Sequence, residues 1–188
     1  NRYIKDCVPK MKDQEVYYVD KSNKDTLMQM QKLEEYDDFF YDLFYNSKIK
    51  DLAANALGED VHPRAMEYFN KPPGKSKPTP PHQDGFYFNL DNDKAVTGWL
   101  ALEDVDDENG CIHYVKGSHS KEEYRPHGKS EILGFSQGVT DFGTEEDKTN
   151  TVKFEGKAGM FLMHDAKTIH FASPNKSLVR SRRAFGFV

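Results

Sequence analysis

The chain has 188 residues, of which 37% are hydrophobic and 13% aromatic, and its formal net charge is -5. This length suits a single domain with a sizeable core, and the aromatic content argues against disorder. The mildly acidic charge gives no reason to expect nucleic acid or an anionic membrane as a partner.

The first third of the chain, about residues 22–58, is predicted to form a helical layer. The first predicted helix starts at Ser22 or Asp25 and carries apolar residues at three- and four-residue spacing, namely Leu27, Met30, Leu33 and Tyr36. Further helices are predicted at residues 38–45 and 47–57. The last of these ends at Gly58, because glycine readily adopts the left-handed conformation of a helix stop.

Residues 62–188 have a different sequence pattern, in which short apolar or aromatic runs alternate with turns rich in Pro, Gly and Asn. The runs predict strands at residues 64–70, 84–90, 96–103, 111–115, 151–154, 160–164, 168–172 and 183–188. The predicted fold is therefore mainly β with an N-terminal helical layer, a double-stranded β-helix (jelly roll, cupin-like) formed by one domain of residues 1–188. Residues 116–150 contain several glycines and charged residues, and we predict that this long insertion covers the site as a lid.

Two further features concern the location of the protein. The sequence lacks the roughly 20 consecutive apolar residues that span a bilayer. Its two cysteines, Cys7 and Cys111, lie far apart, so no disulfide framework is expected and the predicted location is the reducing cytoplasm. The sequence begins at Asn1, which leaves a preceding targeting segment open, and the oligomeric state is not predicted.

The segment His82-Gln83-Asp84 is the first candidate for chemistry. Residues i and i+2 of a strand point to the same face, so His82 and Asp84 can offer an imidazole nitrogen and a carboxylate oxygen to one ion. Two histidines and one carboxylate on one octahedral face are the pattern of non-haem iron(II) oxygenases. The spacing alone does not identify the second histidine, and we expect His164 to be a structural residue on a strand.

Six motifs follow one another in order between about residues 66 and 187. They are Lys71-Pro72-Pro73, Pro81-His82-Gln83-Asp84, residues 99–104, Glu108-Asn109-Gly110-Cys111 with Gly117-Ser118-His119, His170 with residues 174–177, and Arg182-Arg183-Ala184. Together they resemble the phytanoyl-CoA dioxygenase family of iron(II)/2-oxoglutarate oxygenases. The N-terminal third resembles that family only in its general helical character.

The resemblance implies which residues hold the cofactors. It implies that one iron(II) ion is bound by His82, Asp84 and His170. It also implies that an arginine, taken here as Arg182, pairs with the distal carboxylate of 2-oxoglutarate through its planar guanidinium. Arg180 and Arg183 are alternative registers, although Arg182 and Arg183 face opposite sides of a strand and only one of them can reach the pocket. Trp99 is expected either near the 2-oxoglutarate pocket or in the core.

The implied reaction is hydroxylation of a small molecule by O2, with decarboxylation of 2-oxoglutarate to succinate and CO2. The presence of Asp84 favours hydroxylation, because related halogenases lack this carboxylate. The sequence does not identify the substrate, but the candidate pocket residues near the metal-binding segment are Tyr68, Gln83, Phe86, Phe88 and Asn89. Two alternatives stay open: a cupin-like metal enzyme that does not use 2-oxoglutarate, and an inactive binding module of the same fold.

Overall fold

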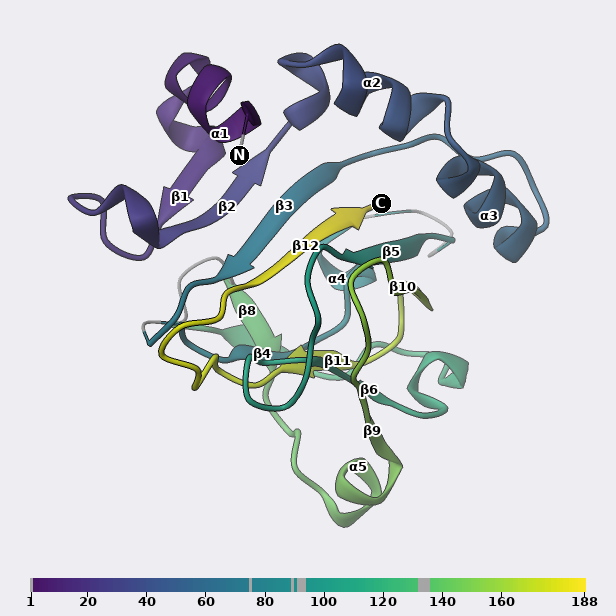
Figure 1. The fold of residues 1–188 in the computed structure, drawn as a ribbon. Coiled ribbons are helices and arrows are strands. Elements are labelled where there is room, and N and C mark those ends of the chain that lie inside the picture. The colour runs from purple at the N-terminus through teal and green to yellow at the C-terminus, as the bar shows by residue number, and fades with distance from the viewer. Residues whose placement is uncertain (1, 75, 89, 91–93, 132–135) are drawn as a thin grey trace.

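Two β-sheets lie face to face in the computed structural model, which describes residues 2–74, 76–88, 90, 94–131 and 136–188 (Figure 1). The larger sheet has six strands in the order β1 (Val16–Tyr18), β2 (Leu27–Gln31), β3 (Met66–Lys71), β12 (Arg182–Phe187), β5 (Val96–Ala101) and β10 (Phe161–Asp165). The smaller sheet has four, in the order β4 (Thr79–His82), β11 (His170–Ala172), β6 (Ile112–Val115) and β9 (Thr151–Phe154). All of the pairings in these two sheets are antiparallel.

The helices cover the face of the larger sheet that points away from the smaller sheet (Figure 1). They are α1 (Arg2–Asp6), α2 (Asp38–Tyr45) and α3 (Lys48–Leu57), while α4 (Gly85–Phe88) and α5 (Glu145–Asn150) lie by the smaller sheet. Short 3-10 turns occur at Val8–Lys10, Asp13–Glu15, Lys24–Thr26, Leu33–Glu35 and Ser118–Ser120. No helix in the described part of the chain is long and apolar enough to cross a membrane.

The two predicted helices at residues 38–45 and 47–57 are confirmed, and capping explains their bounds. The side chains of Asp37 and Ser47 accept hydrogen bonds from the backbone N–H groups of the first turns of α2 and α3. Gly58 ends α3 with a φ of 72°, as expected for a glycine stop. The apolar face of α2 packs through Phe40 and Phe44 onto the larger sheet.

The helix predicted to start at Ser22 or Asp25 is wrong, because Leu27–Gln31 forms strand β2 between β1 and β3. This strand is enclosed on both faces. Leu27 and Met30 pack into the helix-covered core, whereas Gln29 and Gln31 face the space between the sheets. Since both faces are covered, the strand lacks the strict polar and apolar alternation of a half-buried strand, and its apolar spacing imitates a helix.

The strand predicted at residues 84–90 is also wrong. Strand β4 ends at His82, and the helical turn α4 follows directly. The N–H of Gly85 donates to the carbonyl of Ala166, and a Cβ at Gly85 would lie only 2.1 Å from the hydroxyl of Tyr124. The aromatic residues that resemble a strand in the sequence therefore belong to a helical turn. The turn lies close to Tyr124 and Ala166, which leaves no room for a side chain at position 85.

Successive side chains of strand β12 point alternately to the core beneath the helices and to the space between the sheets. Phe185 and Phe187 belong to the core beneath the helices, whereas Arg182 and Gly186 line the space between the sheets. The remaining seven predicted strands correspond to observed strands, most of them with shifts at their ends. They are residues 64–70 (β3), 96–103 (β5), 111–115 (β6), 151–154 (β9), 160–164 (β10), 168–172 (β11) and 183–188 (β12). The fold is mainly β with few helices.

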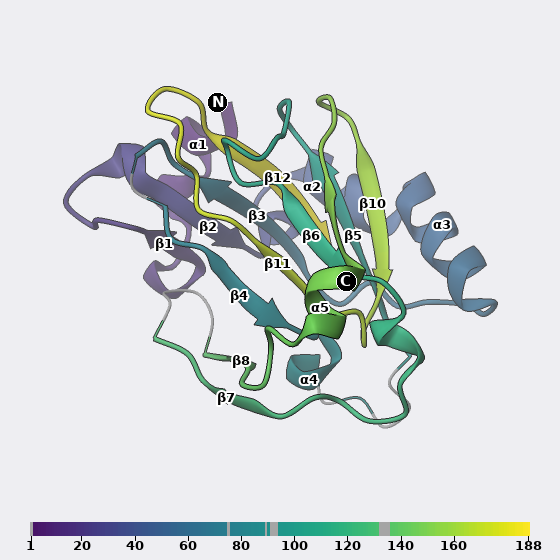
Figure 2. The same cartoon turned by 90° about the horizontal axis from the view of Figure 1, so that it is seen from below.

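The segment 116–150 contains a two-stranded ribbon, β7 (His127–Lys129) with β8 (Gln137–Val139), which lies beside β4 (Figure 2). It is anchored at several points. The side chain of Arg125 pairs with Asp141 and Asp147, and the hydroxyl of Tyr87 donates to the carbonyl of Gln137. None of its described residues lines the space between the two sheets.

Candidate metal centre

Three side chains that could hold a metal ion meet at the adjoining ends of β4 and β11. His170 is the cross-strand partner of His82, and Asp84 follows in the turn before α4. Oδ1 of Asp84 lies 3.4 Å from Nε2 of His82 and 3.6 Å from Nε2 of His170. One ligand atom from each residue lies within 4.8 Å of the other two, so a single ion can contact all three on one face of its coordination sphere.

The two imidazoles are held in the orientation that a metal requires. Nδ1 of His82 lies 2.8 Å from the carbonyl of Pro80, and Nδ1 of His170 lies 3.0 Å from the carbonyl of Thr168. A carbonyl only accepts, so each Nδ1 carries the proton and donates. Each Nε2 therefore keeps its lone pair for a metal.

The charge state of the cluster also suits a cation. Burial alone would raise the pKa of Asp84, but the neighbouring His170, His164 and His82 hold it well below its usual range. Burial, followed by the proximity of His82, lowers the pKa of His170 well below its ordinary value. At neutral pH the cluster therefore offers one carboxylate and a neutral imidazole at His170, which are the forms that bind metal.

The second oxygen of Asp84 has partners of its own. The hydroxyl of Thr97 donates to Oδ2 across 2.6 Å, and Nε2 of His164 lies 3.1 Å from the same atom. The expectation that His164 is a structural residue on a strand is correct as to its place in β10, but its ring points at the metal-binding carboxylate. No local pattern in the sequence indicates this contact, because 80 residues separate the two side chains.

The cluster lies on the wall of a cavity of about 430 Å³ between the two sheets. Arg182 and Trp99 line the same cavity, with the guanidinium 5.5 Å from the centre of the indole ring. Arg182 is 5% exposed, and its Nε has no hydrogen-bond partner. Among the described residues no carboxylate forms an ion pair with it. Burial lowers its pKa to about 10, so the group is still charged at neutral pH.

The two alternative arginines are engaged elsewhere. Arg183 points away from the cavity and pairs with Glu103, and Arg180 pairs with Asp106 at 2.8 Å. Neither residue lines the cavity. Of the three registers considered from the sequence, Arg182 is thus the one whose side chain enters the cavity, as the alternation of a strand requires.

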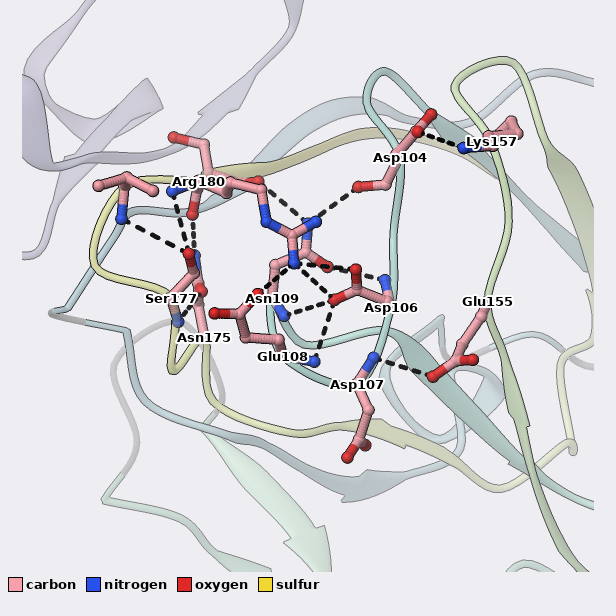
Figure 3. Close-up of polar contacts among 12 residues, drawn as sticks. Asp104, Asp106, Asp107, Glu108, Asn109, Glu155, Lys157, Asn175, Ser177 and Arg180 are labelled. Atoms are coloured by element: carbon pink, nitrogen blue, oxygen red, sulfur yellow. Dashed lines mark hydrogen bonds and ion pairs between the residues drawn. The ribbon is translucent and has the colours of Figure 1, made fainter.

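A polar network holds the loops on either side of Arg182 (Figure 3). The side-chain amide of Asn109 donates to the carbonyls of Asp104 and Ser181, at 2.9 and 3.3 Å. That of Asn175 donates to the carbonyls of Lys71 and Arg180, at 2.8 and 2.6 Å. These two asparagines come from the sequence motifs and act on the backbone, so their contribution is to fix where β12 begins.

The predicted pocket residues lie in different parts of the structure. Phe88 lines the cavity, whereas Tyr68 packs into the helix-covered core because it lies on the outer face of β3. Gln83 is 1% exposed. Its amide nitrogen donates to the carbonyl of Lys167, and its amide oxygen accepts from the N–H of Arg125. Phe86 stacks on His127, with ring centroids 4.0 Å apart, and does not line the cavity. Asn89 lies outside the described residues.

Several cavity residues were not predicted from the sequence. They come from β2, β3 and β5 and are Gln29, Gln31, Glu67, Lys71 and Thr97. Glu67, Phe69 and Lys71 alternate along β3, so strand periodicity could have found two of them. Gln29 and Gln31 were missed because their strand was taken for a helix.

A second group of potential ligands lies outside the cavity. Ligand atoms of Asp107, Cys111 and His113 also lie within 4.8 Å of one another. Asp107 is exposed, and burial raises the pKa of the Cys111 thiol to about 11. Asp107, Cys111 and His113 do not line the cavity that contains Arg182, so we centre the site on His82, Asp84 and His170.

Comparison with known proteins agrees with this geometry. Residues 3–184 match the family model of phytanoyl-CoA dioxygenase (PhyH). The chain is 29% identical over 175 residues to a probable alpha-ketoglutarate-dependent hypophosphite dioxygenase of Stutzerimonas stutzeri, covering 90% of this chain and 60% of that protein. It is 31% identical over 157 residues to phytanoyl-CoA dioxygenase of Arabidopsis thaliana, covering 81% and 53%. The chain thus spans little more than half the length of these relatives.

Two solved structures are similar in fold. EvdO2 from Micromonospora carbonacea var. aurantiaca, solved in complex with 2-oxoglutarate, has a TM-score of 0.68 at 26% identity, with 85% of this chain and 64% of that chain covered. The epimerase SnoN in complex with Fe3+, alpha ketoglutarate and nogalamycin RO has a TM-score of 0.71 at 26% identity, with 85% and 61% covered.

Proposed function

Since the chain belongs to the phytanoyl-CoA dioxygenase family, we propose that it is an iron(II) oxygenase that uses 2-oxoglutarate and O2 to hydroxylate a small molecule. Succinate and CO2 are the products of the co-substrate. One observation carries the proposal: a cluster of two histidines and one carboxylate shares a cavity with a buried arginine that has no carboxylate partner among the described residues.

In this proposal His82, Asp84 and His170 hold the iron, whose remaining positions stay open for 2-oxoglutarate and O2. The bound iron supplies the oxidation chemistry that couples O2 to decarboxylation of the co-substrate. Arg182 receives the distal carboxylate of 2-oxoglutarate, and Trp99 packs against the guanidinium. Arg182 is buried and charged, and no carboxylate in the described part of the chain pairs with it. This supports the assignment, because such a group is costly unless an anion binds it.

The two facing sheets support the further proposal that residues 1–188 form one oxygenase domain with a jelly-roll core. A small-molecule substrate, in a cavity of about 430 Å³, fits the same picture. Its identity stays open, since the names of the two relatives refer to hypophosphite and to phytanoyl-CoA. The cytoplasmic location stays a prediction.

The two alternatives from the sequence are disfavoured by the same observation. A cupin-like enzyme that does not use 2-oxoglutarate has no need of an unpaired arginine in its metal cavity. An inactive binding module has no need of a complete ligand set with correctly oriented imidazoles.

The test is release of succinate from 2-oxoglutarate by the iron-loaded protein with a panel of candidate substrates. We expect O2-dependent succinate release that is abolished in D84A, because Asp84 is the anionic ligand of the cluster. R180A is the matched control, since Arg180 pairs with Asp106 outside the cavity. Full turnover by D84A with iron bound at wild-type affinity would show that the ligand assignment is wrong.

A further inference from the structure

The two oxygens of Asp84 face different surroundings. Oδ1 faces Nε2 of both His82 and His170, at 3.4 and 3.6 Å. Oδ2 points the other way and accepts from the hydroxyl of Thr97 at 2.6 Å, with Nε2 of His164 at 3.1 Å. The carboxylate is thus divided into an oxygen that faces the metal cluster and an oxygen that is held by two protein donors.

The two donors occupy one rung of the larger sheet. His164 on β10 is the cross-strand partner of Thr97 on β5, and both line the cavity. Directly opposite residues of paired strands project to the same face of the sheet, so the side chains of Thr97 and His164 can both reach Oδ2 of Asp84. The two side chains come from rigid neighbouring strands, and His164 is 7% and Thr97 8% exposed.

A third residue contacts the other nitrogen of the His164 ring. The hydroxyl of Tyr114, on β6 of the smaller sheet, lies 2.8 Å from Nδ1 of His164. A carboxylate oxygen only accepts, so Nε2 of His164 carries the proton that it donates to Asp84. Nδ1 is then unprotonated and accepts from Tyr114. This chain of contacts runs from one sheet, through the imidazole, to the metal-binding carboxylate.

We propose that His164 and Thr97 are positioning residues that hold Asp84 as a monodentate metal ligand, with Tyr114 holding the other side of the His164 ring. This inference rests on the proposed function. With Oδ2 engaged, only Oδ1 is available to the metal. An octahedral ion bound by three protein atoms keeps about three positions, which is the number that a chelating co-substrate and O2 require together. A bidentate carboxylate would remove one of these positions.

The contacts separate this role from that of a fourth ligand. Nε2 of His164 already faces Oδ2 of Asp84, and the ligand atoms that lie mutually within 4.8 Å belong to His82, Asp84 and His170. His164 therefore acts on the metal through Asp84. Such supporting residues affect metal affinity by about 10- to 100-fold when they are removed from other metal sites.

The experiment measures Mn2+ binding to the metal-free protein without 2-oxoglutarate, so that it does not depend on activity. The test variants are T97V, H164L and T97V/H164L, which remove the donors. The conservative variants are T97S and H164Q, which keep a donor in place. H119L is the control, because His119 is an exposed histidine that does not line the cavity and belongs to neither group of potential metal ligands. Circular dichroism checks that each variant is folded.

We expect T97V/H164L to bind Mn2+ about 10- to 100-fold more weakly than the wild type, with T97S, H164Q and H119L close to the wild type. Water-proton relaxation of the Mn2+-saturated proteins counts the waters on the ion. We expect about three waters in the wild type and about two in T97V/H164L, where Oδ2 is free to reach the metal. An unchanged affinity would overturn the positioning role, and an unchanged water number would overturn the monodentate role.

The H82A variant separates this inference from the proposed function. Mn2+ binding that is lost in H82A but insensitive to T97V/H164L contradicts the inference alone. Binding that survives H82A, or the absence of binding by the wild type, contradicts the metal site itself and with it the proposed function.

Discussion

Arg182 is a residue whose place the sequence and the structure define together. The motif left three candidate registers, and the alternation of β12 sends Arg182 into the cavity while Arg183 pairs with Glu103 on the other face. The sequence could not show that Arg182 is unpaired, because its surroundings come from strands far apart in the chain.

Replacing Arg182 with Ala should therefore weaken the binding of 2-oxoglutarate without changing the affinity for the metal. Truncating one member of a buried charge pair costs about 2 to 5 kcal/mol, which corresponds to a Michaelis constant for 2-oxoglutarate raised at least tens-fold. Iron affinity should stay near the wild-type value, since Arg182 makes no contact with the three ligands. The R180A and R183A proteins are controls, and the same loss in either of them would move the anchor to that residue.

Lys71 is a second buried basic residue at the same end of the cavity. It is the cross-strand partner of Arg182, is 6% exposed, and its Nζ donates to the carbonyl of Lys77. Burial, with a smaller effect of Arg182, lowers its pKa to about 6, so Lys71 is largely neutral at pH 7.5 in the free protein. A bound carboxylate would favour the charged form and raise this pKa.

Binding of 2-oxoglutarate should therefore take up a proton at Lys71. The free-state pKa is about 6 and the bound-state pKa is higher, so affinity is greatest below pH 6 and falls as the pH rises between the two values. The loss should reach at most about tenfold per pH unit. Titration calorimetry from pH 6 to 8 in two buffers of different ionisation enthalpy measures the uptake, and K71M should lose it. Identical pH dependence in wild type and K71M would exclude Lys71 as the group that titrates.

At the scale of elements, local signals predicted α2 and α3 well, because their caps and spacing lie within the segment itself. The same local signals predicted a helix where β2 forms and a strand where α4 forms. The state of Leu27–Gln31 depends on pairing with β3, about forty residues later, and the turn at Gly85 depends on contacts with Tyr124 and Ala166. His82 and Asp84 meet as predicted, but through a strand end and a helical turn, not along one strand.

The proposal that residues 116–150 act as a lid stays a prediction. The contacts of Arg125 and Tyr87 fix parts of this segment beside β4, yet its described residues do not line the cavity. If the ribbon β7–β8 opens, its amides should exchange hydrogen much faster than those of β5 when iron and 2-oxoglutarate are present without substrate, and substrate should slow them. Protection equal to that of β5 before substrate is added would make it a fixed element.

At the scale of the whole molecule, the larger sheet separates two interiors. Its outer face is covered by the helices and carries one core (Figure 1). Its inner face and the smaller sheet enclose the cavity that holds the metal cluster and Arg182. The β-rich C-terminal part and the ligand residues could be predicted from composition and motifs. The polar wall from β2 could not, because it exists only once the N-terminal segment joins the sheet.

The most direct test of this arrangement is an anaerobic titration of the protein with Fe(II) and 2-oxoglutarate, followed by the charge-transfer absorption of the iron-bound keto acid. The account predicts that the wild type develops this band at about one Fe(II) per chain. H170A should show no band, and R182A should show it only at much higher 2-oxoglutarate. No band in the wild type, or a band of wild-type strength in H170A, would contradict the claim that one cavity holds both the iron and its co-substrate.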